Sequence, residues 1–240
     1  MGKSTLFFLL CILIIILSLF CGCTQESDDN TELIDAIDDS QLIGYWRFDE
    51  ESWQRTENEI IDSSGNNNHG TVFETTQIQP GRIGEGHVFF DGVDDYIIIN
   101  ETNILEPQKL TIETWVKKTG SNPFEYIISK GANNCDMSSY ALYTDLNGGL
   151  TFYVSDGVNA IKSANMNTSI WDESWHHIAG SFDGKNCRLY VDGEEVQSSI
   201  EYNLSINYSL PTHNNLYIGA FNGTCFLPFN GYIDELFIWN

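Results

Sequence analysis

Four oxygen-bearing side chains are the clearest candidates for metal chemistry in this sequence. Hard cations such as Ca²⁺ bind clustered carboxylate, amide and backbone carbonyl oxygens. Asp62 opens a turn rich in Gly and Asn, in which Asn67 offers an amide oxygen. Asp49 follows the first apolar segment after residue 40, and Asp234 lies in the last one. The sequence therefore predicts a structural calcium site formed by Asp49, Asp62, Asn67 and Asp234, unless Asp62 and Asn67 serve only to shape the turn.

Aromatic and amide side chains in predicted loops form a second group, one that could bind sugar. Aromatic rings can stack on sugar rings, and loops are where a rigid scaffold carries its specificity. The candidates for ligand binding are Phe124, Tyr126, Trp171, Asn222 and Phe226. In the alternative, these side chains fold back onto a sheet and serve only packing.

The carboxylates do not form an evident hydrolytic pair. Glycoside hydrolysis needs two carboxyl groups about 5 to 10 Å apart, which on one strand means acidic residues two or four positions apart. The pattern Glu-x-Asp-x-x-Glu is absent from the sequence, and so is a Gly-x-Ser-x-Gly nucleophile elbow. Asp234 and Glu235 are adjacent and are expected to point to opposite faces of a strand, while Glu113 stands alone. The sequence predicts a protein that is not an enzyme, with a glycan-active hydrolase as the minor alternative.

The overall charge narrows the choice of partners. Lys and Arg total 11 against 34 Asp and Glu, which gives a net charge of −23. Such a surface repels phosphate backbones, so a nucleic-acid partner is not expected. The same field attracts cations, divalent ones included.

The N-terminal residues are typical of an exported protein. Lys3 precedes an apolar run over residues 6–21, which is short for a membrane span of about 20 residues. The Gly22-Cys23 pair after this run resembles the lipobox of lipoproteins, in which the cysteine is acylated. We predict a signal peptide over residues 1–22 and lipidation of Cys23, or alternatively an uncleaved N-terminal membrane anchor. Both place the protein in the cell envelope, on the outer face of the membrane.

An acidic segment separates this leader from the rest of the chain. Residues 24–40 contain seven acidic side chains, no basic ones and few large apolar ones. Such a composition favours a self-repelling, disordered chain. We predict that residues 23–40 comprise the lipidated cysteine and a tether.

Three cysteines lie beyond the tether, where an exported protein meets oxidising conditions. Cys187 alternates with Leu189 and Val191 and is therefore expected to point into a core. Cys135 and Cys225 lie in predicted loops. We predict a Cys135–Cys225 disulfide and a free, buried Cys187; the alternative pairs Cys187 with Cys225.

From residue 41 onward the chain consists of short segments with β character. They are rich in Ile, Val, Tyr, Phe and Trp, and Asp-Gly or Asn-Gly turns separate many of them. No segment keeps the apolar spacing of a helix over a dozen residues. The predicted strands cover residues 42–48, 87–90, 96–100, 110–117, 126–130, 140–144, 150–155, 175–182, 187–191, 216–220 and 232–239. The pattern indicates an all-β sandwich or jelly roll.

Motifs distributed over this region resemble one known family. In chain order they are GYWRFDE (44–50), DSSGNNNHG (62–70), FDGVDDY (90–96), IETWV (112–116), SKG (129–131), WHHIAG (175–180), LYVDG (189–193), LYIG (216–219) and GYIDEL (231–236). Together they resemble the laminin-G-like branch of the concanavalin A-like lectin/glucanase superfamily. The resemblance implies an all-β, two-sheet antiparallel jelly-roll sandwich over residues 41–240. In that fold the first and last strands lie close together, which would let Asp49 and Asp234 converge, and several members hold a structural calcium on this side.

The resemblance also implies a function, because the family consists mainly of binding and adhesion modules. We expect a surface-anchored module that recognises carbohydrate; the alternative is an envelope protein that docks another protein without recognising sugar. Sequons for N-glycosylation, which would mark surface loops, occur at Asn100, Asn167, Asn203, Asn207 and Asn222.

Overall fold

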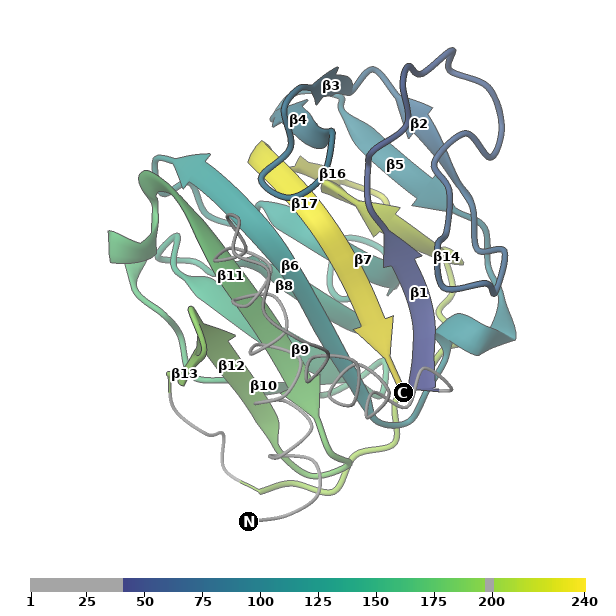
Figure 1. Cartoon of the computed structure of the whole chain (residues 1–240). Coiled ribbons are helices and arrows are strands. Elements are labelled where there is room, and N and C mark those ends of the chain that lie inside the picture. The colour runs from purple at the N-terminus through teal and green to yellow at the C-terminus, as the bar shows by residue number, and fades with distance from the viewer. Residues whose placement is uncertain (1–40, 197–200) are drawn as a thin grey trace, which may run out of the picture. The chain divides into compact units, whose positions relative to one another are not determined.

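Two antiparallel β-sheets face each other in the computed structural model, which describes residues 41–196 and 201–240 (Figure 1). The predicted signal peptide, the lipidation of Cys23 and the tether lie outside the described residues. No helix within the described part has the length and apolar composition needed to cross a membrane.

The first sheet, called sheet A, has eight strands. In spatial order it contains β13 (Glu194–Glu195), β12 (Cys187–Val191), β11 (Asp172–Phe182), β6 (Leu110–Thr119), β17 (Asn230–Trp239), β4 (His87–Asp91) and β3 (Thr76–Ile78), with β1 (Leu42–Trp46) pairing with β17. The first and last strands are thus neighbours, as the jelly-roll topology implies (Figure 1).

The second sheet, called sheet B, has seven strands. In spatial order it contains β10 (Ala160–Lys162), β9 (Leu150–Ser155), β8 (Tyr140–Thr144), β7 (Tyr126–Ala132), β14 (His213–Ile218), β5 (Tyr96–Ile99) and β2 (Gly70–Phe73). A separate hairpin of β15 (Ala220–Asn222) and β16 (Phe226–Pro228) follows β14. Two short 3-10 turns, η2 (Asn103–Leu105) and η3 (Thr168–Ile170), lie in connections. The predicted fold class, an all-β two-sheet jelly roll, is confirmed.

The core lies between the two sheets and follows the period-2 alternation of the strands. In β6, Leu110, Ile112 and Val116 belong to the core, whereas Glu113 and Trp115 lie on the opposite, outer face of sheet A. Burial of large apolar side chains of this kind stabilises the fold by about 1.5 to 3 kcal/mol each.

Gly180 shows how closely the two sheets approach. It lies in β11 of sheet A, and a Cβ added at this position would come within 2.3 Å of the ring of Phe152, which is fully buried in β9 of sheet B. Only glycine therefore allows the aromatic ring to pack against the facing backbone.

A β-bulge in β17 changes the direction of two acidic side chains. The register with β6 shifts between Asp234 and Phe237, and Glu235 has a φ of 52°. Ile233 and Leu236 both point into the core, with Asp234 and Glu235 between them. The expectation that adjacent Asp234 and Glu235 point to opposite faces is wrong, because a bulge inserts one residue out of alternation.

Candidate functional site

A pocket lies on the outer face of sheet B, away from the core between the sheets. Its floor is a separate apolar cluster to which Tyr126 of β7, Tyr143 of β8 and Tyr153 of β9 contribute. Three neighbouring strands thus present tyrosines on the same side, because residues with the same parity share one face. The cavity has a volume of about 340 Å³ and is lined by Phe124, Tyr126, Cys135, Asp136, Met137, Tyr143, Tyr153, Ala160, Lys162 and Leu227.

The tyrosine rings are fixed by contacts with one another. Tyr126 and Tyr143 are cross-strand partners, and their rings stack with centroids 5.0 Å apart. The rings of Tyr143 and Tyr153 meet edge to face at 5.3 Å. Such aromatic pairs hold their geometry without help from a ligand, so the floor of the pocket is preformed.

Polar atoms are distributed around this aromatic floor. The Tyr153 hydroxyl accepts a hydrogen bond from the backbone N–H of Ser138 (2.8 Å), and Lys162 Nζ donates to the Tyr143 hydroxyl (2.9 Å). Burial raises the pKa of Tyr153 to about 12, and burial also raises the pKa of Tyr126. Both phenols therefore keep their protons near neutral pH and can act as neutral donors and acceptors.

The predicted disulfide between Cys135 and Cys225 is present and borders the pocket. It joins the loop that carries Asp136 and Met137 to the β15–β16 hairpin, which supplies Leu227. Cys187 is free and buried, its Sγ lies 3.1 Å from the carbonyl oxygen of Ile161, and burial raises the pKa of its thiol to about 12. The alternative pairing of Cys187 with Cys225 is therefore wrong.

The structure divides the five predicted ligand-binding residues. Phe124 and Tyr126 line the pocket. Asn222 and Phe226 pair with each other across the β15–β16 hairpin; Asn222 Nδ2 donates to a tyrosine hydroxyl outside the pocket, and neither residue lines the cavity. Trp171 follows the packing alternative: it packs in the main core, and its Nε1 donates to the carbonyl oxygen of Gly148 (2.7 Å).

Sequence reasoning missed the side chains that β8, β9 and β10 contribute. Tyr143 and Tyr153 lie in strands buried along their whole length, so alternation does not distinguish their inner and outer faces. Lys162 lies in a three-residue strand that was not predicted. Charge at a sheet edge is a known feature of edge strands, and this was the one sequence signal that could have drawn attention to Lys162.

The four predicted calcium ligands do not form one cluster. Asp62 accepts hydrogen bonds from the backbone N–H groups of Tyr45, Ser64 and Asn68 at 2.9 to 3.0 Å. Asn67 has a φ of 60° in the same turn. Within residues 41–196 and 201–240, one group of three His, Cys, Asp or Glu side chains has ligand atoms that all lie within 4.8 Å of one another. This group consists of Asp91, Asp94 and Asp95. In this structure Asp62 and Asn67 therefore shape the turn, as the alternative interpretation of these two residues predicted.

Asp49 and Asp234 instead hold one loop from two sides. Asp49 Oδ1 accepts from the backbone N–H groups of Glu85 (2.6 Å) and Gly86 (3.0 Å), and Asp234 Oδ2 accepts from that of Ile83 (3.0 Å). The carboxylate of Asp49 also pairs with Arg47 (2.9 Å). The loop over residues 80–86 therefore connects the first and last strands through carboxylates.

Asp234 and Glu235 form an acidic pair that sequence reasoning did not anticipate. Burial, reinforced by nearby carboxylates, raises the pKa of Asp234 to about 8 and that of Glu235 to about 7. Glu235 Oε2 accepts from the Tyr45 hydroxyl, while Asp234 Oδ1 and Glu235 Oε1 are buried without a hydrogen-bond partner. Carboxylates in such surroundings are stabilised by a proton or by a bound cation.

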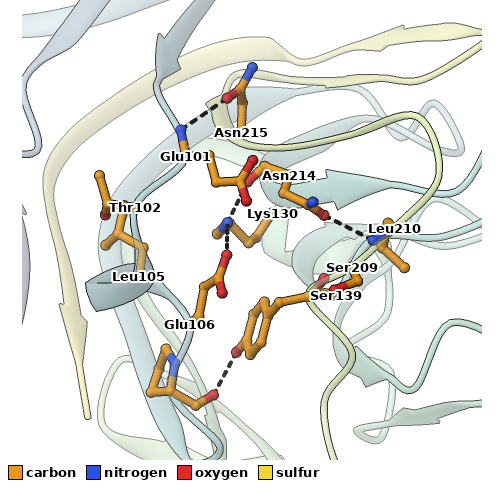
Figure 2. Close-up of polar contacts among 12 residues, drawn as sticks. Glu101, Thr102, Leu105, Glu106, Lys130, Ser139, Ser209, Leu210, Asn214 and Asn215 are labelled. Carbon is orange, nitrogen blue, oxygen red and sulfur yellow. Dashed lines mark hydrogen bonds and ion pairs between the residues drawn. The ribbon is translucent and has the colours of Figure 1, made fainter.

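Polar residues around the buried Lys130 satisfy its amine (Figure 2). Lys130 of β7 is 0% exposed, and its Nζ donates to Glu106 Oε1 (3.1 Å) and to the carbonyl oxygen of Asn214. Burial lowers the pKa of Lys130, and Glu106 opposes this effect. The amine links β7 to the segment after η2 and to β14, so it is a structural cross-link.

The predicted sequons occupy two kinds of position. Asn100, Asn167 and Asn203 are exposed, as glycan acceptors need to be. Asn207 and Asn222 are half-buried, and their side chains bond to Ser209 and Tyr217.

Comparisons with known proteins agree with this architecture. A family model described as the concanavalin A-like lectin/glucanases superfamily matches residues 91–240. Comparison with curated protein sequences finds no match.

Solved structures with the same fold include domain 4 of AbnA, a GH43 extracellular arabinanase from Geobacillus stearothermophilus, in complex with arabinotriose. Its TM-score is 0.62 at 18% identity, and the match covers 83% of this chain and 92% of that chain. The binding domain of botulinum neurotoxin DC is similar in its complexes with SialylT (TM-score 0.56, 13% identity) and with rat synaptotagmin II (TM-score 0.57, 14% identity). Both toxin matches cover 84% of this chain and 48% of that chain, so the chain spans about half the length of the toxin domain. At these identities the likeness shows the fold.

Proposed function

Because the chain belongs to the concanavalin A-like lectin/glucanase superfamily, we propose that it is a non-catalytic module that binds carbohydrate through the pocket on the outer face of sheet B. Within this superfamily the fold alone does not fix the ligand, so the proposal rests on the site.

The single observation that carries the proposal is the preformed aromatic pocket. Its volume of about 340 Å³ lies within the range of small-ligand sites, which are mostly apolar with a few oriented polar groups. Phe124, which is 40% exposed, offers a ring face for a sugar next to the buried Tyr126. The phenol of Tyr143 and the carboxylate of Asp136 offer hydrogen bonds to the sugar's hydroxyl groups. The complexes of similar domains with arabinotriose and SialylT support the choice of carbohydrate.

A matched pair of aromatic substitutions tests the site. Phe124 and Phe73 are both 40% exposed, but only Phe124 lines the pocket. We expect Phe124→Ala and Tyr126→Ala to reduce binding to any glycan captured on an array, and Phe73→Ala to leave it unchanged. Isothermal titration then gives the affinities, and melting temperatures establish that each variant is folded. Equal loss with Phe73→Ala would contradict the proposal.

The non-catalytic part of the proposal is supported by the positions of the acidic side chains. Asp136 is the one carboxylate in the pocket lining, whereas glycoside hydrolysis uses two. Glu113 accepts from Trp239 Nε1 (2.9 Å) and lies 3.4 Å from His177 Nε2. Asp234 holds the 80–86 loop. None of these three acidic and basic side chains lines the pocket. Release of reducing ends from any polysaccharide by the purified protein would revive the hydrolase alternative.

Calcium remains a proposal for the acidic pair Asp234 and Glu235. Each of these carboxylates has a buried oxygen without a hydrogen-bond partner, which a cation could satisfy. Asp49, Asp62 and Asn67 do not complete a cluster of ligands around this pair in the described residues. A bound cation would neutralise the acidic pair. We expect calcium to raise the melting temperature relative to chelator, and Asp234→Asn to remove the rise. A rise that survives Asp234→Asn would place the ion elsewhere.

Attachment to the membrane is proposed from the leader alone. We propose that Cys23 is acylated and holds the domain on the outer face of the cell envelope, where two acyl chains suffice for stable anchoring. Metabolic labelling with a fatty acid should mark the wild-type chain and fail to mark Cys23→Ser.

A protein ligand is the second candidate, favoured by the similar toxin domain in complex with synaptotagmin II. If no glycan binds but Phe124→Ala abolishes capture of a surface protein, the pocket serves protein docking.

A further inference from the structure

Lys162 is the one basic side chain that lines the sheet B pocket. It ends the edge strand β10, is exposed, and donates through Nζ to the hydroxyl of Tyr143. Because this phenol accepts a hydrogen bond from Lys162, its own proton remains available for a ligand oxygen. A positive charge and an O–H donor are thus held side by side at the pocket.

Basic side chains are few in this protein, 11 against 34 acidic ones. Among the described residues, half of the lysines and arginines pair with carboxylates: Arg47 with Asp49, Arg55 with Glu74, Lys118 with Glu125, Lys130 with Glu106, and Arg188 with Asp183. The others form no ion pair within the described part of the chain, and of these Lys162 is the one that lines the pocket. Across residues 41–196 and 201–240, Lys162 forms no ion pair. Its charge is held by a neutral phenol and remains available to an anion.

We propose that the pocket prefers anionic sugars, whose carboxylate or sulfate group pairs with Lys162 while the sugar ring packs on Phe124. The inference rests on the proposed carbohydrate-binding function and specifies its ligand class. The surrounding negative surface repels anions at a distance, and the lining contains the Asp136 carboxylate as well as Lys162. An acidic sugar is therefore favoured only where its anionic group lies against Lys162 and away from Asp136. Because the lysine ammonium group acts as a compact point charge, it can pair with either a carboxylate or a sulfate.

Ligand pairs with the same sugar skeleton and a different charge test this preference. Titration of the purified full chain compares trigalacturonate and sialyllactose each with its methyl ester, and sulfated lactose with lactose. We expect the anionic member of each pair to bind roughly tenfold more tightly, because its charged group forms a hydrogen bond with Lys162 that the neutral member lacks. The affinity ratios of the carboxylate pairs, compared with that of the sulfate pair, distinguish the carboxylate from the sulfate.

Two lysine substitutions assign the preference to a residue. Lys185 is also exposed and outside any ion pair among the described residues, but it lies in the turn before β12, away from the pocket lining. We expect the ratio of the affinities for the anionic and the neutral sugar to fall to near one in Lys162→Gln and to keep its wild-type value in Lys185→Gln. Because Lys162 is exposed, both variants should keep the wild-type melting temperature.

The outcomes separate this inference from the proposed function. Equal affinity for charged and neutral sugars, or a preference that survives Lys162→Gln, overturns the inference; if Phe124→Ala still abolishes binding, the carbohydrate pocket stands. If no sugar of either kind binds, the inference and the proposed function fail together.

Discussion

Lys130 and Lys162 both lie in sheet B, yet the fold uses them in opposite ways. Lys130 is fully buried on the core side and donates to Glu106 and to the backbone of Asn214. Lys162 is exposed on the outer side and donates to the phenol of Tyr143. Buried charge must be paired, because desolvation otherwise costs several kcal/mol. An exposed charge can be left without a carboxylate partner, and this is the condition under which it can serve a ligand.

The largest effect expected from this contrast is on stability. Lys130→Met removes the charge that compensates the Glu106 carboxylate, and we expect the free energy of unfolding to fall by about 3 kcal/mol, as when a buried pair loses one partner. Lys162→Met should change it by less than about 0.5 kcal/mol. Urea unfolding of both variants measures the difference.

A double variant shows whether the ion pair is the cause. Glu106→Gln combined with Lys130→Met removes the unpaired carboxylate, so part of the lost stability should return. If both single lysine variants lose the same stability, the distinction between a structural and a ligand-facing lysine is wrong.

The second effect concerns the Cys135–Cys225 disulfide, which belongs to both the fold and the pocket. It closes a loop of 90 residues, and removing a native disulfide of this kind typically costs about 2 to 4 kcal/mol. In Cys135→Ser/Cys225→Ser we expect a fall in this range, together with weaker glycan binding at temperatures where the domain remains folded. Denaturant unfolding and titration of the same sample separate the two effects. Unchanged affinity in the folded variant would show that the pocket walls need no covalent tie.

The sequence predicted more of the fold than of the pocket, for physical reasons visible in particular strands. The segment 110–117 alternates apolar and polar residues, so its core face could be predicted. The segments 140–144 and 150–155 are buried on both faces, so their outward tyrosines, Tyr143 and Tyr153, could not be recognised. The pocket is therefore formed largely by residues whose orientation only the sheet register determines.

The acidic residues illustrate a different limit. The family resemblance correctly placed the first strand beside the last, so Asp49, just after β1, and Asp234, in β17, lie on the same side of the fold. It did not reveal the bulge that turns Glu235 out of alternation, nor that the Asp62 carboxylate would be taken up by backbone N–H groups. These outcomes depend on local backbone geometry, which residue types constrain only weakly.

The smallest effect concerns His176 on sheet A, where charge is paired at the surface. Burial of the ring lowers its pKa, but hydrogen bonds to Asp192 (2.7 Å) and Asp172 (3.1 Å) outweigh this and raise the pKa above its ordinary value. A raised folded-state pKa stabilises the protein below the unfolded-state pKa, near 6.5, and the contribution disappears as pH rises through the folded value. Both carboxylates are about half exposed, so the gain should stay below about 1 kcal/mol.

The stability difference between wild type and His176→Gln measures this contribution free of the other titrating groups. We expect the difference to be largest at about pH 5.5 and to shrink by about pH 8.5, since the imidazole is then neutral. It should also shrink at high ionic strength, because exposed pairs are screened. A difference that grows with pH would mean that His176 acts through packing. In that case the charge of His176 would not stabilise the fold. His176 would then resemble Lys162 and differ from Lys130, whose charge does stabilise the fold.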